Sequence, residues 1–290
     1  MIHLGISGGG TKIGGLFGVA EVLMLQHGRK FDVISGISSG AVLALPLALG
    51  LFDEVRELVV NYTHKQFFKK SPITKKGKIS VSAILKLIRF KPYLGDQSQL
   101  ITTLGKIVSR ELFEKYKKGK YADIYVGSVD ILSGSKVYPN LKHLDYEDAL
   151  QAVLASASIP IFTKGVRTKD RWYFDGGLRD HSPTSYVLEN IEGITESVSV
   201  YSRPKDYKVF IDPPKNFIQL LMRVIDVMNI ELSKSDEQRE DEICLRKGIK
   251  QKKHYLPSIM KSVYDVDQRR LRAVYQAGLQ VGRETFKWIA

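Results

Sequence analysis

The sequence predicts an α/β fold with a mainly parallel central sheet, and two stretches near the N-terminus carry this prediction. In the first, an apolar strand at Ile2–Ile6 leads through the glycine-rich Ser7–Gly15 into a helix over Leu16–Gln26. In the second, an apolar strand at Phe31–Ile34 leads through a turn into the apolar helix Ala41–Leu49. Two successive strand–loop–helix segments indicate a βαβ unit, whose loops both open at the carboxyl edge of a parallel sheet.

The turn after the second strand predicts a catalytic serine. Gly36-Ile-Ser-Ser-Gly40 fits the pattern G-x-S-x-G, in which a strained strand-to-helix turn exposes the central serine, here Ser38. Gly36 and Gly40 lack a Cβ that would crowd the turn, and the helix starting near Ser39 directs its N–H groups toward Ser38. An ordinary Gly/Ser turn is the alternative, but the strand before it and the helix after it are the context that the motif requires.

The glycine-rich loop after the first strand indicates an anion close to backbone N–H groups. A phosphate-binding P-loop would need Gly-Lys-Ser/Thr, whereas the order here is Thr11-Lys12-Ile13. A dinucleotide-binding loop would need glycine at the position of Ile13. A transient oxyanion, formed beside Ser38 at the same edge of the sheet, is therefore the better candidate.

Composition and charge limit the class of protein. The 290 residues include 43% hydrophobic and 26% charged ones, as expected of one large catalytic domain. Cys244 is the only cysteine and no basic, apolar leader precedes Ile2, so we expect a reducing, cytosolic compartment. The longest apolar run, Ala41–Phe52, is too short to cross a bilayer. The net charge of +13 predicts a polyanionic partner: nucleic acid, anionic lipid or an acidic protein.

Segment 67–94 has an unusual composition. Cations alternate with apolar side chains and no acid opposes them; the cations are Lys69, Lys70, Lys75, Lys76, Lys78, Lys86, Arg89 and Lys91. This pattern fits a membrane-interface segment or a lid over a site. A solvated basic loop followed by a helix packed on the core fits equally well.

The middle of the chain predicts a strand at Tyr121–Ile131, a return strand at Lys136–Tyr138 and a helix at Tyr146–Ala155. A short strand, Arg171–Phe174, then runs into Asp175-Gly176-Gly177. An acid at a strand end followed by glycines has an exposed carboxylate, although an Asp-Gly β-turn is the simpler interpretation of that stretch alone.

After a helix at Thr184–Glu189 and a strand at Glu196–Tyr201, no further strand is indicated. Helical spacing over Phe217–Leu232 and Asp267–Trp288 predicts a helical tail. Its acidic run (236–242) and basic run (246–253) are expected to form a solvated face. We thus predict a catalytic domain over residues 1–212 and a helical extension over 213–290, packed on the same domain.

Three segments taken in order resemble the patatin-like phospholipase family. They are Gly8-Gly-Gly-Thr-Lys12, like its glycine-rich oxyanion loop; Gly36-Ile-Ser-Ser-Gly40; and Asp175-Gly176. Supporting likeness lies in Val126–Gly134, Ala155–Pro160 and Tyr275–Gly278. The resemblance covers Met1 to Pro183 well and the tail thinly. It implies a three-layer patatin-like fold.

The resemblance implies a lipid acyl hydrolase of the phospholipase A or lysophospholipase type with a Ser38–Asp175 dyad. Amides of Gly8, Gly9, Gly10 and Ser39 would hold the oxyanion, and Lys12 would support that loop or meet a phosphate. No metal or other cofactor is implied. The substrate would be a phospholipid at a membrane surface, reached through segment 67–94 on the inner face of a membrane, with or without a protein activator.

Two alternatives stay open at this point. His181, in Asp180-His-Ser-Pro183, offers the third member of a Ser-Asp-His triad, but it lies only six positions beyond Asp175. His254, in a basic segment, is the weaker candidate. The other alternative is a catalytically silent protein of this fold that binds nucleic acid or an acidic partner, although retention of both Ser38 and Asp175 argues against it.

Overall fold

The computed structural model describes residues 1–74, 79–206, 213–214, 217–260 and 264–284. Within these residues eight strands form one sheet, in the order β5-β6-β3-β2-β1-β7-β8, with β4 paired to β3. The strands are β1 (Ile2–Ile6), β2 (Val33–Ile37), β3 (Asp123–Asp130), β4 (Ser135–Val137), β5 (Val166–Arg167), β6 (Trp172–Asp175), β7 (Glu196–Tyr201) and β8 (Lys250–Tyr255).

The predicted parallel sheet is confirmed. β3, β2, β1, β7 and β8 run parallel to one another. β4 and β6 pair antiparallel with β3, and β5 pairs antiparallel with β6. Leu4, Ile6 and Ile34 are fully buried, which explains why the central strands are apolar runs without alternation.

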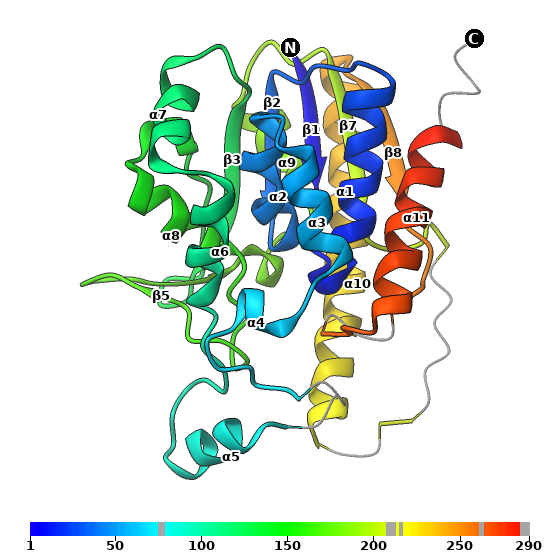
Figure 1. The fold of residues 1–290 in the computed structure, drawn as a ribbon. Coiled ribbons are helices and arrows are strands. Elements are labelled where there is room, and N and C mark those ends of the chain that lie inside the picture. Colours follow the sequence, from blue (N-terminus) through cyan, green and yellow to red (C-terminus); the bar gives the residue numbers. More distant parts are fainter. Residues whose placement is uncertain (75–78, 207–212, 215–216, 261–263, 285–290) are drawn as a thin grey trace.

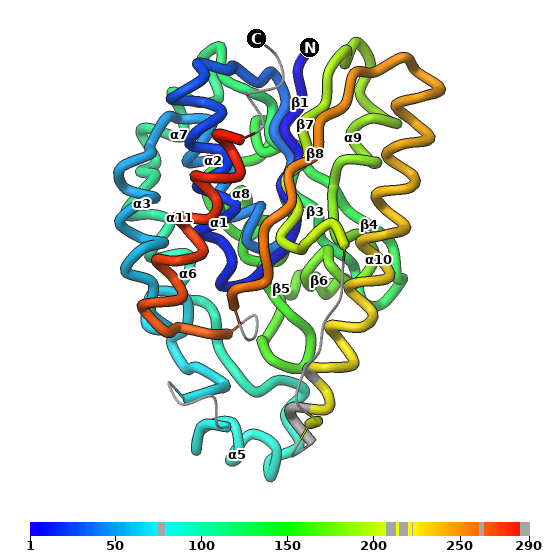
Figure 2. The backbone as a smooth tube through the Cα atoms, turned by 90° about the vertical axis from the view of Figure 1, so that its right-hand side faces the viewer, coloured from blue at the N-terminus to red at the C-terminus, as the bar shows by residue number. Residues whose placement is uncertain are grey.

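Helices cover both faces of the sheet and give three layers. Figure 2 shows α1, α2, α3, α8 and α11 on one side of the sheet, and α9 and α10 on the other. The helices are α1 (Ile13–Glu21), α2 (Ser39–Ala48), α3 (Phe52–Val60), α4 (His64–Phe67), α5 (Val81–Ile88), α6 (Gln99–Ile107), α7 (Arg110–Lys118), α8 (Tyr146–Ser156), α9 (Thr184–Asn190), α10 (Phe217–Lys247) and α11 (Gln268–Glu284), with short helical turns η1 (Gly10–Lys12), η2 (Val22–Gln26), η3 (Leu141–His143) and η4 (Gly176–Leu178).

The predicted elements differ from the observed ones mainly at their ends. β2 begins two residues later than predicted and runs through Ile37, so the strand includes the first part of the serine motif. The helix predicted over Leu16–Gln26 begins earlier, at Ile13, and ends in the π turn η2. The predicted end of the last helix, at Trp288, lies outside the described residues.

The prediction that no strand follows Tyr201 is wrong, because β8 joins the sheet edge beside β7. Its sequence, Lys250-Gln-Lys-Lys-His-Tyr255, lacks the apolar character that indicates a strand. The charge is balanced instead by α10, since Lys253 pairs with Glu237 and Asp241. Lysines are common on edge strands because they oppose further pairing.

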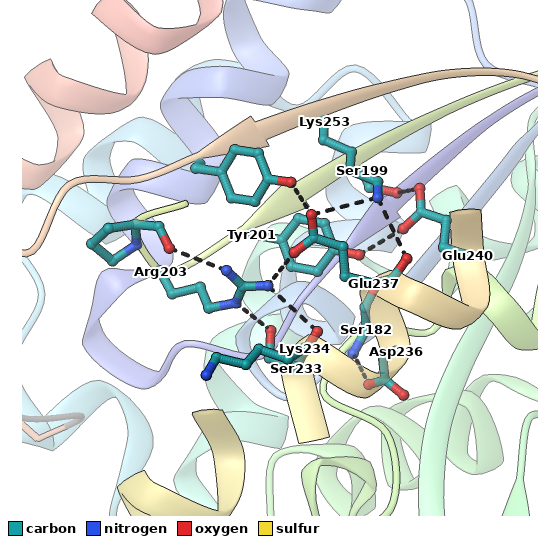
Figure 3. A network of polar contacts seen from close by, with 12 residues as sticks. Ser182, Ser199, Tyr201, Arg203, Ser233, Lys234, Asp236, Glu237, Glu240 and Lys253 are labelled. Carbon is teal, nitrogen blue, oxygen red and sulfur yellow. Dashed lines mark hydrogen bonds and ion pairs between the residues drawn. The ribbon is translucent and has the colours of Figure 1, made fainter. Parts of the chain in front are cut away.

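The acidic run of α10 is also not the solvated face that its charge predicted. Asp236 and Glu240 are buried. Glu240 accepts hydrogen bonds from Ser199 and Tyr201 of β7, and Glu237 binds Arg203 and Tyr255 (Figure 3). These acids therefore fasten α10 to the sheet, and burial raises the pKa of Glu240.

Segment 67–94 does not follow the interpretation of a helix packed on the core. α5 buries Ala83, whereas the side chains of Val81, Ile88 and Phe90 are 74%, 67% and 96% exposed. Figures 1 and 2 both place α5 away from the sheet, beside the first turns of α10. Among the helices of the described residues, none is long and apolar enough to span a membrane.

Candidate active site

The turn at Ser38 holds the nucleophile in a strained backbone conformation. Ser38 has φ 56° and ψ −120°, a region that residues other than glycine seldom adopt. A Cβ on Gly36 would lie 2.3 Å from the Gly40 carbonyl, and one on Gly40 would lie 2.2 Å from the Ile6 carbonyl oxygen. Both glycines are therefore required by contact, and α2 begins directly after Ser38 with its positive dipole end at the serine.

Strand β3 brings Asp175 to Ser38. Its consecutive residues Gly127 and Ser128 pair with Ile37 of β2 and with Asp175 of β6. The last residue of β2 and the last residue of β6 thus occupy neighbouring places along one strand. A Cβ on Gly176 would approach the Gly127 carbonyl oxygen to 2.6 Å, which explains why a glycine follows the acid.

Ser156, the last residue of α8, and Ser158, two residues later, fix the backbones of Ser38 and Asp175. Ser156 accepts a hydrogen bond from the Ser38 backbone N–H at 3.0 Å and donates one to the Gly127 carbonyl at 2.6 Å. Ser158 accepts the Asp175 backbone N–H on its carbonyl at 2.8 Å. The same helix end therefore sets the positions of Ser38 and Asp175 relative to each other.

The Asp175 carboxylate is buried and faces the serine. It accepts hydrogen bonds from the Ser38 side chain and, at 2.8 Å, from the Gly177 backbone N–H. Burial raises its pKa to about 6, and these two hydrogen bonds offset part of that rise. A carboxyl group with a raised pKa beside a hydroxyl is suited to general base catalysis.

The glycine-rich loop lies beside Ser38, with one correction to the predicted donors. The Gly8 N–H donates to the His181 carbonyl at 3.1 Å, and the Gly8 carbonyl accepts from the Ser202 hydroxyl, so Gly8 anchors the loop and is not an oxyanion donor in this conformation. No acceptor is recorded for the N–H groups of Gly9 and Gly10 within the described chain. Gly10 has φ +54°, which favours glycine.

Two cavities meet at Ser38. The larger cavity encloses about 890 Å³, counting its open mouth, and the aromatic cavity about 460 Å³. The larger one is lined by Gly8, Gly9, Gly10, Lys12, Ser38, Ile159, Pro160, Phe162, Asp175, Gly177, Leu178, His181, Ser202, Arg203, Ile225, Asp226, Asn229, Ile230 and Tyr264. The aromatic one is lined by Gly10, Ile13, Ser38, Ser39, Tyr62, Phe67, Phe68, Ala157, Ile159, Thr163 and Tyr264.

Other predicted residues also have a defined place. Lys12 lines the larger cavity, whereas Ile13 begins α1 and turns a buried side chain to the aromatic cavity. Ser39, the first residue of α2, lines the aromatic cavity beside the nucleophile.

The two histidines have different surroundings. His181 lines the larger cavity, its ring lies 3.5 Å from the Ser202 hydroxyl, and burial lowers its pKa to about 3. Its backbone N–H donates to Asp236 of α10. His254 lies on β8 and lines neither cavity. Of the two candidates for a third triad member, only His181 is near Ser38.

Several residues of the site were not predicted from the sequence. Ser156 and Ser158, which hold the backbones of Ser38 and Asp175, lie in Ala155–Pro160, a stretch that the sequence singles out only by its family likeness. Ser202 and Arg203 follow β7, so the rule that loops gather at the carboxyl edge of the sheet could have found them. Nothing in the helical spacing of the tail pointed to Asp226.

No group of three His, Cys, Asp or Glu side chains in the described part of the chain is placed to hold a metal ion. The N–H groups of Gly9 and Gly10 and the N-terminal end of α2 lie beside Ser38.

Comparison with known proteins identifies the family of the chain. A family model described as patatin-like phospholipase matches residues 4–188, more than half of the chain. Among solved structures, VipD from Legionella pneumophila is similar, with a TM-score of 0.48 and 15% sequence identity. That match covers 98% of this chain and 66% of the VipD chain, just under two thirds of it. No curated protein matches. The family model and the extent of its match show that the chain belongs to the patatin-like phospholipases, a family of lipid acyl hydrolases.

Proposed function

We propose that the protein cleaves fatty-acyl esters of glycerophospholipids, as a phospholipase A or lysophospholipase, through a Ser38–Asp175 dyad. One observation carries this proposal. Ser38 lies on a strained turn and forms a hydrogen bond with the buried Asp175 carboxylate, whose pKa is raised. In the described structure it shares a cavity with the N–H groups of Gly9 and Gly10, which have no hydrogen-bond acceptor there. Nucleophile, base and oxyanion donors thus converge on one place.

The first half of the reaction forms an acyl-enzyme. The Ser38 oxygen attacks the ester carbonyl carbon while its proton passes to the Asp175 carboxylate. The N–H groups of Gly9 and Gly10 bind the developing oxyanion, each such donor being worth about 3 kcal/mol in the transition state. The bond to the alcohol oxygen then breaks, and Asp175 returns the proton to that oxygen as the lysophospholipid or the glycerophosphodiester leaves.

The second half releases the fatty acid. Water attacks the acyl-enzyme carbonyl and gives a proton to Asp175. The oxyanion forms again at the same amides, and the proton returns to the Ser38 oxygen as the ester bond breaks. The step consumes one water and restores the enzyme.

A combined labelling and hydrolysis assay tests this function. We expect a fluorophosphonate probe to label Ser38, and fatty acid to be released from mixed-lipid vesicles with or without a chelator. Ser38→Ala should abolish both signals. A protein that binds nucleic acid in a salt-sensitive manner and neither labels nor hydrolyses would instead support the silent binding protein.

A Ser-Asp-His esterase is the second candidate, favoured by the presence of His181 in the larger cavity. The His181 ring forms a hydrogen bond with the Ser202 hydroxyl, and within the described residues His181 forms none with Ser38 or Asp175. The dyad is therefore the simpler proposal.

We further propose that the enzyme reaches its substrate through an apolar, basic surface formed by α5 and the start of α10, which we call the α5–α10 surface. Its apolar side chains are 44–96% exposed; they are Val81, Ile84, Leu85, Leu87, Ile88, Phe90, Leu220, Val224, Val227 and Met228. Next to it, Arg89 and Lys91 are exposed cations that follow α5, whereas the ammonium nitrogen of Lys86 is buried near Asp96. Apolar groups amid cations are complementary to an anionic bilayer.

The position of this surface supports the proposal. Ile225 packs in the same small cluster as Ala83 of α5 and also lines the larger cavity. A lipid leaving a bilayer that touches the α5–α10 surface would therefore meet the mouth of the cavity.

The double substitution Ile88→Ser/Phe90→Ser is expected to weaken binding to vesicles containing phosphatidylglycerol by about 100-fold or more. Each side chain loses roughly 1.5–3 kcal/mol of apolar burial in the bilayer. Cosedimentation with vesicles measures the effect. Leu25→Ser/Leu245→Ser is the matched control, since these leucines are 53% and 86% exposed, on η2 and at the opposite end of α10. An equal loss of vesicle binding in both double variants would contradict the proposed surface.

A further inference from the structure

The two cavities that meet at Ser38 have different chemistry, and this difference bears on substrate choice. Among the described residues, no charged side chain lines the aromatic cavity, and Tyr62, Phe67 and Phe68 form much of its wall. Besides the proposed base Asp175, the larger cavity carries Lys12, His181, Arg203 and Asp226. At the scissile ester, the acyl chain extends on one side and the alcohol with its head group on the other. The chain therefore fits the aromatic cavity, and the head group fits the larger one.

Most of the polar groups of the larger cavity already have partners. Arg203 forms an ion pair with Glu237 and donates to Ser233 at 2.7 Å (Figure 3). Burial keeps His181 neutral by lowering its pKa. These two residues therefore present no uncompensated charge to a ligand.

Lys12 and Asp226 differ from them. The charges of Lys12 and Asp226 interact electrostatically, yet within the described chain no ion pair or hydrogen bond joins the two side chains. Arg223, three residues earlier on α10, also acts on Asp226 but does not line the cavity. A cation and an anion thus face the same space without direct contact, and both lose hydration there. Such a pair gains most from a ligand that carries both signs of charge.

We propose that the larger cavity selects zwitterionic phospholipids, with the phosphate at Lys12 and the ammonium group of a choline or ethanolamine head group at Asp226. This inference rests on the proposed function and names its substrate class. A zwitterion compensates both side chains. A head group with phosphate alone, such as phosphoglycerol, leaves the Asp226 carboxylate unpaired and close to a negative ligand, which disfavours that ligand.

The test uses short-chain diacyl phospholipids kept monomeric, so that attraction to a bilayer plays no part. Phosphatidylcholine and phosphatidylethanolamine are compared with phosphatidylglycerol of the same acyl chains. The wild-type kcat/KM should favour the zwitterions by about tenfold or more, as expected for a desolvated charge pair. Asp226→Asn, which keeps the shape of the side chain, should bring this ratio close to one, and Asp226→Glu should retain a preference.

Glu231→Gln is the matched control, because it removes the same charge from an exposed position on the same helix. The control should keep the wild-type ratio. The proposal is overturned if the wild-type enzyme prefers phosphatidylglycerol or shows no preference, whether or not the variants fold. It is also overturned if Asp226→Asn changes both classes by the same factor. In these cases labelling of Ser38 and hydrolysis of the lipids leave the proposed function standing. Absence of both would refute the proposed function as well.

Discussion

Exchange of Asp175 for Asn is expected to lower kcat/KM for ester hydrolysis by about four orders of magnitude, as removal of a catalytic group does in serine hydrolases. The amide has nearly the same shape but cannot take the Ser38 proton. Hydrolysis of a soluble short-chain ester measures the effect. Near-wild-type activity in the folded variant would show that Asp175 is not the base.

The same substitution, although it removes activity, should raise the free energy of unfolding. The pKa of Asp175 is raised in the folded state from 3.8 to about 6, so the buried carboxylate destabilises the fold once it ionises. Its favourable protonated form is fully present below pH 3.8 and is lost as the pH rises through 6. Asp175→Asn should therefore stabilise the protein by up to about 3 kcal/mol above pH 6 and by little below pH 4. Urea denaturation at pH 4 and pH 8 measures this difference.

Ser156→Ala is expected to reduce kcat by about 10- to 100-fold with little change in KM, because a small displacement of a reacting group has effects of this size. Ser156 acts through the backbone of Ser38 and does not touch the substrate, so it is a positioning residue. Without its hydroxyl, the Ser38 N–H and the Gly127 carbonyl lose their shared partner.

Ser197→Ala is the matched control, since Ser197 is also buried and bonded, to His3 in the core. It should alter stability without altering kcat. Ser156→Thr, which keeps a hydroxyl, should restore part of the rate. A Ser156→Ala enzyme with unchanged kcat, or one whose loss matches that of Ser197→Ala, would contradict the positioning role.

The sequence predicted those parts of the site that depend on local backbone chemistry. Gly36 and Gly40 are required by close contacts within one turn, and such requirements leave a short motif. The parallel strands were predicted because burial on both faces leaves continuous apolar runs. The places of Ser38 and Asp175 followed from motifs at the ends of such strands.

Features that depend on partners distant in sequence were not predicted. The charges of the β8 lysines and of the α10 acids neutralise each other at the sheet edge. In isolation, each run of charges therefore indicates a solvated surface. Likewise, Asp226 becomes a cavity residue only because the N-terminal part of α10 extends past the carboxyl ends of the strands (Figure 1). The Gly8 amide was expected to be a donor to the oxyanion, and only the fold shows that the His181 carbonyl already takes it.

The most direct test of the dyad is the pH dependence of kcat/KM for wild-type enzyme and His181→Ala on a soluble ester. With Asp175 as the base, activity requires its ionised form and should rise through a single ionisation near pH 6 in both proteins, with similar plateaus. Asp236, whose pKa is also raised to about 6, is controlled by Asp236→Asn, which should keep the profile. A neutral histidine base with a pKa near 3 would instead stay active well below pH 6. Collapse of activity in folded His181→Ala, or a profile that stays flat toward pH 4, would contradict the Ser38–Asp175 dyad.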